Sequence, residues 1–323
     1  MKVKWKHRSN KKMDITMIVA KITWSGSLEQ AARVVELSII DAPDDNNIKK
    51  MDIKIVLGDV IELEKQGELF FYGIVQTKEK TGQNGVVTYS CTDLLCHLLR
   101  STGVYNFKNT TPERIAKQVC SDFQIPIGKL EETKVTIKKM ILDEETIYDI
   151  IVRAYKKASK QTGEKYVCKM DGRTLTVRKR GEKTVTLLLE EGKNIYDVHQ
   201  QETIENMVNK IKIYNTKRKQ IGEVKKDAWI KNYGIFQQIY KKEKGVNEIT
   251  AANNLLNGIE KTLSLNAING KIDSVAGNII KLKDKTLKLE GLFWIIADSH
   301  TWENGIHTMN LELKFHKMAG DKK

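Results

Sequence analysis

Two histidines stand at a spacing that could support metal chemistry. His300 and His307 lie seven residues apart around Asn304-Gly305, a dipeptide typical of a tight hairpin turn, so two facing strands would bring the imidazoles together. Imidazole nitrogens bind zinc, but a protein zinc site uses at least three ligands. No third nitrogen or sulfur ligand lies beside this pair in the sequence. We therefore interpret both as ordinary histidines and predict no metal site and no cofactor site.

Three consecutive carboxylates could in principle catalyse hydrolysis. Asp143, Glu144 and Glu145 offer the acid and base that glycoside cleavage needs, about 5 to 9.5 Å apart. An apolar helical pattern follows them, however, and carboxylates at a helix start bind free N–H groups and favour the helix dipole. We interpret them as the cap of a helix that begins at Asp143. Since no GxSxG, GxxxxGK[ST], HExxH or GxGxxG motif occurs, we predict no catalytic residue and no enzymatic activity.

The four cysteines show no metal or redox pattern. Cys91, Cys96, Cys120 and Cys168 include no CxxC pair and are too sparse for a disulfide framework. They indicate reduced core thiols, and Cys120 lies on the apolar stripe of a predicted helix.

A basic segment with interleaved aromatic residues is the strongest candidate for binding. Residues 217–244 contain nine basic and three acidic residues. The spacings of four, three and four among the aromatics would place all of them on one helical stripe: Trp229, Tyr233, Phe236 and Tyr240. Three interpretations stay open, namely a stacking platform for single-stranded nucleic acid, a contact with a protein partner, and internal packing. We take these four as the candidate partner contact.

The amino-acid composition limits the classes of protein to which the chain can belong. The chain has 323 residues, 40% hydrophobic and 30% charged, and a net charge of +14, which fits two or three folded domains. The charge is compatible with nucleic acid, an anionic membrane surface, an acidic protein face, or the codon bias of an AT-rich genome. The basic start is followed by an apolar stretch only from Ile15 to Ala20, and no apolar run approaches the roughly 20 residues of a membrane span. We predict no signal peptide, no membrane anchor and assembly in the cytoplasm.

The hydrophobic periodicity predicts an α+β, mainly β protein with two small β-barrel domains flanking an α+β domain. We expect a first barrel over 1–99, an α+β domain over 100–182, a second barrel over 183–318 with a partly helical insertion at 217–269, and a tail at 319–323. Turns are expected at 43–46 and 82–85. The middle domain has helices expected from Thr111-Pro112 and from Asp143 to Gly163, then a hairpin turning at Asp171-Gly172. A helix from Asn247 is expected to bury Ile249, Ala252, Leu256, Ile259 and Leu263.

Several short motifs along the chain resemble one family. They are Gly58-Asp59-Val60-Ile61, Leu69 to Val75, Tyr89 to Leu95, Thr111-Pro112-Glu113, Thr146 to Ile151, Asn206-Met207-Val208-Asn209, and Gly291 to Ile296 with His300. Together they resemble the XkdQ/YqbQ type of baseplate hub protein of contractile phage tails and tailocins, related to late control D proteins and the N-terminal part of VgrG. The resemblance covers about residues 15 to 318.

The resemblance implies a structural role in an infectious phage, a defective prophage or an R-type bacteriocin. Hubs of this type are homotrimers that adapt the hexameric tail tube to the central spike and enclose the channel. The implied partners are the tail tube protein, the spike protein, other baseplate proteins and the tape measure protein, with nucleic acid at most passing through the channel. The alternative from the residues alone is a basic nucleic-acid-binding protein that uses segment 217–244.

Overall fold

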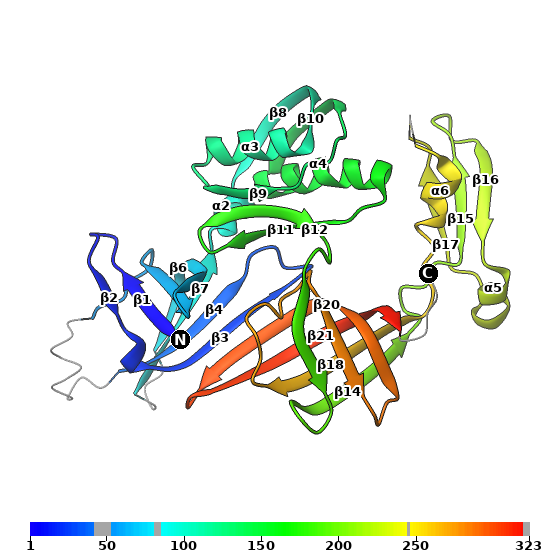
Figure 1. Ribbon diagram of the computed structural model, residues 1–323. Coiled ribbons are helices and arrows are strands. Elements are labelled where there is room, and N and C mark those ends of the chain that lie inside the picture. The colour runs from blue at the N-terminus through cyan, green and yellow to red at the C-terminus, as the bar shows by residue number, and fades with distance from the viewer. Residues whose placement is uncertain (42–52, 81–84, 244–245, 319–323) are drawn as a thin grey trace.

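A computed structural model of the chain describes residues 1–41, 53–80, 85–243 and 246–318. The turn predicted at 43–46, the first three residues of the turn predicted at 82–85, and the tail predicted at 319–323 lie outside the described residues. Within them the protein is mainly β, with short helices concentrated in the middle of the chain (Figure 1). No helix in the described ranges is long and apolar enough to cross a membrane.

One large sheet combines strands from both ends of the chain (Figure 1). Its hydrogen-bonded order is β14-β18-β21-β20-β3-β4-β7-β6-β5-β1-β2, and β19 pairs with both β20 and β13 beside this path. Its thirteen strands are β1 (Lys2–Lys6), β2 (Lys12–Asp14), β3 (Val19–Ser27), β4 (Val34–Ile40), β5 (Val60–Lys65), β6 (Glu68–Lys80), β7 (Val86–Asp93), β13 (Thr184–Glu190), β14 (Ile195–Thr203), β18 (Glu260–Ile268), β19 (Ile279–Asp284), β20 (Leu289–Glu303) and β21 (Ile306–Met318).

The two predicted barrels are therefore not separate closed units. β3 pairs antiparallel with β20 over seven residues, from Lys21↔Glu303 to Ser27↔Ala297, and this seam joins the N-terminal and C-terminal strands. No pairing between the described strands β2 and β14 closes the order into a ring. The barrel prediction located several strands of both halves but missed β1, β2, β14 and β18, and periodicity along one strand carries no information about its neighbour.

Each half of the sheet has its own core. In the N-terminal half Trp5, Leu37 and Ile61 are buried together, and in the C-terminal half Phe293, Leu265 and Leu311 form a second cluster. The alternating burial of β3 and β20 is what a strand with one core-facing side produces. Hydrophobic alternation thus predicted strands such as β3 and β20, while their joining into one sheet depends on the β3–β20 pairing.

Above the sheet lies the α+β middle part (Figure 1). Its core contains Leu98, Ile115, Cys120 and Ile150, all fully buried. Its elements are α2 (Leu95–Arg100), β8 (Thr102–Thr110), α3 (Pro112–Asp122), β9 (Ile127–Leu130), β10 (Ile137–Thr146), α4 (Ile147–Thr162), β11 (Tyr166–Asp171) and β12 (Thr174–Lys179). The helix predicted to begin with Pro112 is confirmed, and the four cysteines are free thiols.

The cap predicted from the three carboxylates is wrong. Strand β10 extends through them to Thr146, with an irregularity in its pairing to β8 between Leu142 and Glu145. Helix α4 begins at Ile147, and the Thr146 hydroxyl accepts a hydrogen bond from the Asp149 N–H at 3.1 Å. Gly163 ends the helix in a left-handed conformation, as predicted. The carboxylates at 143–145 thus belong to a strand, and Thr146 supplies the N-cap.

The hairpin of β11 and β12 is confirmed, although its turn is one residue later than predicted. Asp171 pairs with Thr174, so Gly172 and Arg173 form the two-residue loop. Gly172 has a φ of 55°, the positive value that such turns require. Because side chains alternate along a strand, Met170, Leu175 and Val177 face the middle core, whereas Lys169 and Thr176 face the large sheet.

Candidate partner interface

A small separate unit projects from the C-terminal half of the large sheet (Figure 1). The chain leaves the sheet after Thr203 and returns at Glu260, two residues that pair with each other in the β14–β18 ladder. Backbone hydrogen bonds of 2.8 and 2.9 Å between Val208 and Asn257 close its base. We name residues 204–259 the insertion module. The predicted insertion of 217–269 therefore begins later than this module and includes the whole of β18, which belongs to the large sheet.

The module has a three-stranded sheet in the order β16-β15-β17, with β16 (Gln220–Lys225), β15 (Lys210–Tyr214) and β17 (Gln237–Lys241). Two short helices, α5 (Asp227–Tyr233) and α6 (Glu248–Asn253), complete it. One face of the sheet forms a core of Ile211, Ile213 and Tyr240, and α6 covers it through Ala252. The run 208–214 was predicted in the second barrel and instead builds this sheet.

The predicted long helix after Asn247 is wrong. The Asn247 side chain does cap α6 by accepting a hydrogen bond from Thr250 N at 3.0 Å, but the helix ends at Asn253. Ile249 and Ile259 are exposed. Leu263 lies in β18, where Leu263 and Leu265 alternate with more exposed neighbours as strand residues do. Asn253-Asn254 and Gly258 interrupt the segment, because both residue types favour turns and helix ends over helix interiors.

The four aromatic residues do not share one helical stripe. Only Trp229 and Tyr233 lie on α5, because Gly234 ends that helix with a φ of 79°. Tyr240 is buried in the module core. Phe236 is 39% exposed, whereas Trp229 and Tyr233 are half-buried. The four rings therefore form no common platform on which nucleic-acid bases could stack.

Trp229 has a structural role at the base of the module. Its ring packs so closely over Gly258 that a Cβ at that position would lie 2.8 Å from it. Gly258 lies directly before the return to β18, so this contact positions the module against the sheet. Of the four predicted contact residues, the geometry leaves Phe236 as the one fully on the surface.

Exposed apolar side chains are concentrated in the module. Of the seventeen large hydrophobic residues that are exposed in the described part of the chain, eight belong to these 56 residues: Ile204, Ile221, Ile235, Phe236, Ile239, Ile249, Leu255 and Ile259. Ile235, Phe236 and Ile239 are 63%, 39% and 58% exposed, and we name them the apolar ridge. Concentrated exposed apolar residues mark protein interaction sites more often than scattered ones do. Of these three residues, Phe236 was predicted from the sequence, and the two isoleucines were not.

Asn209 is the buried residue that holds the apolar ridge in place. Its side-chain amide donates to the Gly234 carbonyl at 2.7 Å, and its Oδ1 accepts from the Phe236 N–H at 2.9 Å. Without this amide, the Gly234 carbonyl and the Phe236 N–H would both lose these partly buried hydrogen bonds. Asn209 occurred in a family-like motif, but sequence alone gave it no role because its partners lie 25 and 27 residues away.

The surface beside the apolar ridge is basic. Ile239 pairs with Lys212 across β15 and β17, and both side chains project from the face opposite the Tyr240 core. On the same face the Lys210 ammonium forms an ion pair with Glu223 at 3.4 Å. Lys241 lies two residues after Ile239 on β17, so its side chain projects from this face too. A partner suited to this face would combine apolar side chains with acidic ones.

The two histidines do meet across facing strands, as predicted. Asn304 and Gly305 form the turn between β20 and β21, both with positive φ. His300 Nδ1 lies 3.0 Å from His307 Nε2, and both rings are buried. His300 Nε2 lies 3.0 Å from the Ser274 carbonyl, which can only accept, so Nε2 carries the proton and Nδ1 accepts from His307. No group of three metal-ligating side chains occurs in the described residues.

We expect this pair to make stability fall in acid. Burial is the main cause that lowers the pKa of both imidazoles below the ordinary value near 6.5, and each would repel the other's proton. The unfolded chain then binds more protons below that pH, so the free energy of unfolding decreases by up to about 1.4 kcal/mol per pH unit for each group. Urea unfolding at a series of pH values from 7 to 4 measures this decrease in the free energy of unfolding. His307→Gln, which keeps an N–H donor, should show a shallower slope, and equal slopes would contradict the expectation.

Known tail proteins share this fold. The 43 kDa tail protein of prophage MuSo2 from Shewanella oneidensis superposes with a TM-score of 0.75 at 15% identity, over 97% of this chain and 98% of that one. A tail protein from Neisseria meningitidis MC58 gives 0.74 at 14% identity, over 98% and 97%. A chain of the Francisella PdpA–VgrG complex gives 0.58 at 12% identity, with all of this chain matched to 59% of that one. The architecture is therefore that of phage-tail proteins.

Sequence comparison gives the family. The chain belongs to the YQBQ-like family, whose model matches residues 22–314. It is 24% identical over 309 residues to the uncharacterised protein YqbQ of Bacillus subtilis strain 168, across 93% of each chain. It is 22% identical over 308 residues to the phage-like element PBSX protein XkdQ of the same strain, again across 93% of each. The resemblance drawn from the motifs is confirmed.

Proposed function

We propose that the chain is a structural baseplate hub of a contractile tail. It would act without catalysis, as a trimeric adaptor that joins the hexameric tail tube to the central spike and encloses the channel. The observation that supports this proposal most is the fold shared with prophage tail proteins along nearly the whole chain. Tube, spike, other baseplate proteins and the tape measure protein are the proposed partners, assembled in the bacterial cytoplasm and released with the particle.

The two-core sheet is compatible with a symmetry adaptor. Each chain contributes an N-terminal and a C-terminal strand group with separate cores, so three copies would offer six related surfaces to a hexameric tube. Strands β2 and β14 end the sheet order and leave edges that neighbouring subunits could pair with. We also propose the division into 1–99, 100–182 and 183–318, whose first boundary falls at the end of α2.

We expect the purified, nuclease-treated chain to have a molar mass of about 111 kDa, three times 36.9 kDa, by size-exclusion chromatography with light scattering. The same stoichiometry should follow from quantitative mass spectrometry of assembled particles, which includes any partner needed for trimerisation. A single copy per particle would contradict the proposal. Binding to single-stranded DNA at about 50 mM salt, with no trimer in either setting, would favour the nucleic-acid alternative.

A further inference from the structure

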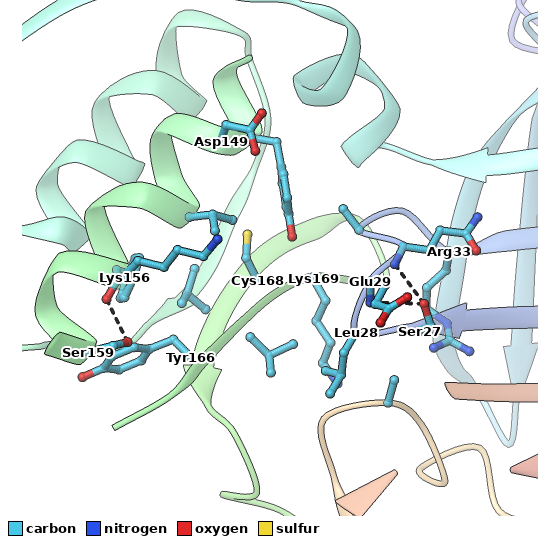
Figure 2. A pocket seen from close by; sticks show the side chains of 18 residues that line it. Ser27, Leu28, Glu29, Arg33, Asp149, Lys156, Ser159, Tyr166, Cys168 and Lys169 are labelled. Carbon is cyan, nitrogen blue, oxygen red and sulfur yellow. Dashed lines mark hydrogen bonds between the residues drawn. The ribbon is translucent and has the colours of Figure 1, made fainter. Parts of the chain in front are cut away.

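A cleft separates the β11–β12 hairpin from the large sheet. The cleft contains three neighbouring cavities of about 320, 380 and 310 Å³, and the Lys169 side chain borders all three. Figure 2 shows the first of them, enclosed by α4, the hairpin and the segment that carries Ser27 and Arg33. Below the hairpin, Gly277 approaches so closely that a Cβ there would lie 3.1 Å from Val167. The cleft is thus a fixed feature of the packing between the two layers.

Lys169 lacks an anionic partner in this cleft. Its ammonium makes no hydrogen bond or ion pair with any residue in the described ranges, although the side chain lies between two packed layers. Removal from water, with Arg33 and Arg178 nearby, lowers the pKa of Lys169 to about 8. An unpaired cation in such a place costs free energy that an incoming anion would recover.

The carboxylates near Lys169 are already engaged by other cations. Asp171 binds Arg178 at 2.6 Å, and Asp273 binds Lys183 at 2.7 Å. Asp298 binds Arg33 and also accepts the Ala276 N–H at 2.7 Å. Each of these charges is compensated within the fold. Four other charged side chains border these cavities, but they are exposed to water: Glu29, Glu68, Asp149 and Lys156. Lys169 is the half-buried cation that no carboxylate in the described residues pairs with.

We propose that this cleft binds one carboxylate, presented by an aspartate or glutamate side chain of a partner polypeptide. One half-buried ammonium matches one negative charge, whereas the second charge of a phosphate dianion would have only the exposed, water-solvated Lys156 in the same cavity. Apolar lining from Val167, Val177 and Ala276 suits the methylene stem of such a side chain. The inference depends on the chemistry of the cleft and not on the trimeric hub proposed above.

The test measures the pKa of Lys169 directly in the full-length protein. The ε-carbon of ¹³C-labelled lysine is followed by NMR from pH 6 to 11, and Lys169→Met assigns the signal. N-acetyl-glutamate N-methylamide, a mimic of a glutamate within a chain, should raise the pKa of Lys169 by at least one unit at constant ionic strength. Sodium chloride at the same ionic strength should leave it unchanged.

Matched controls separate the outcomes. Lys156→Met removes an exposed lysine that borders the first cavity and releases no carboxylate from an ion pair, so the response of Lys169 should persist in that variant. An equal or larger shift with inorganic phosphate would overturn the proposal in favour of a phosphate site. No shift with the glutamate mimic would overturn it outright. Both results are independent of the oligomeric state, so they leave the hub proposal unaffected.

Discussion

Asp298→Ala should destabilise the protein by about 3 to 5 kcal/mol, because it leaves the buried Arg33 guanidinium unpaired. Asp298 lies on β20 and Arg33 directly precedes β4, so their bidentate ion pair lies across the seam that joins the two halves of the sheet. The guanidinium also lies 3.9 Å from the centre of the Trp24 ring on β3. Asp298→Ala therefore removes the carboxylate that pairs with the Arg33 guanidinium, which lies beside β3, β20 and the start of β4.

Urea unfolding of the purified variant measures this loss, with Glu202→Ala as the matched control. Glu202 forms an exposed ion pair with Lys261 at 2.7 Å, and its removal should leave the free energy of unfolding almost unchanged because solvent screens the pair. The double variant Arg33→Met/Asp298→Leu should recover a substantial part of the loss, since apolar residues of similar volume leave no charge buried. Similar losses in Asp298→Ala and in the Glu202 control would contradict a role of this pair at the seam.

Phe236→Ser combined with Ile239→Ser should leave the protein folded and reduce its incorporation into tail particles by a hundredfold or more. Both side chains are exposed, so folding loses little, whereas central apolar contacts of a protein interface contribute about 2 kcal/mol or more each. The measurement is the amount of variant chain that co-purifies with particles, relative to wild type. Incorporation at the wild-type level would contradict the assignment of the apolar ridge as a partner contact.

Tyr240→Ala is the informative contrast, because it changes the neighbour of Ile239 on the opposite face of β17. Tyr240 belongs to the buried core of a unit of only 56 residues, and removal of a buried aromatic ring costs about 3 to 5 kcal/mol. We expect hydrogen exchange to accelerate throughout residues 204–259 in this variant and to stay unchanged in the double serine variant. The pair of experiments separates lost contact from lost folding.

Local patterns predicted the elements whose order is set by nearby residues. Thr111-Pro112 and Gly163 bound helices as expected, and the Asn304-Gly305 turn brought His300 to His307. Failures occurred where a distant partner decides the conformation. Strand β10 continues through residues 143–145 because β8 pairs with Leu142 and Glu145 on either side of an irregularity. Leu263 lies in a strand because β14 and β21 flank it.

The candidate interface was predicted only in part for the same reason. Spacing alone assigned Trp229, Tyr233, Phe236 and Tyr240 to one stripe, but Gly234 ends the helix, and pairing with β15 extends the chain after it. The strand period then turns Tyr240 inward and Ile239 outward. Lys169 was missed because its neighbours come from segments more than 100 residues apart in the sequence.

The β3–β20 seam also constrains how the protein is synthesised. β3 ends at Ser27, whereas its partner begins at Leu289, so more than 250 residues must leave the ribosome before that edge of β3 is covered. An uncovered strand edge is a template for pairing with other chains, and pairing over such sequence separation is slow. Nascent chains on one polysome therefore expose the same edge side by side, and the time before β20 emerges is the period in which aggregation competes with folding.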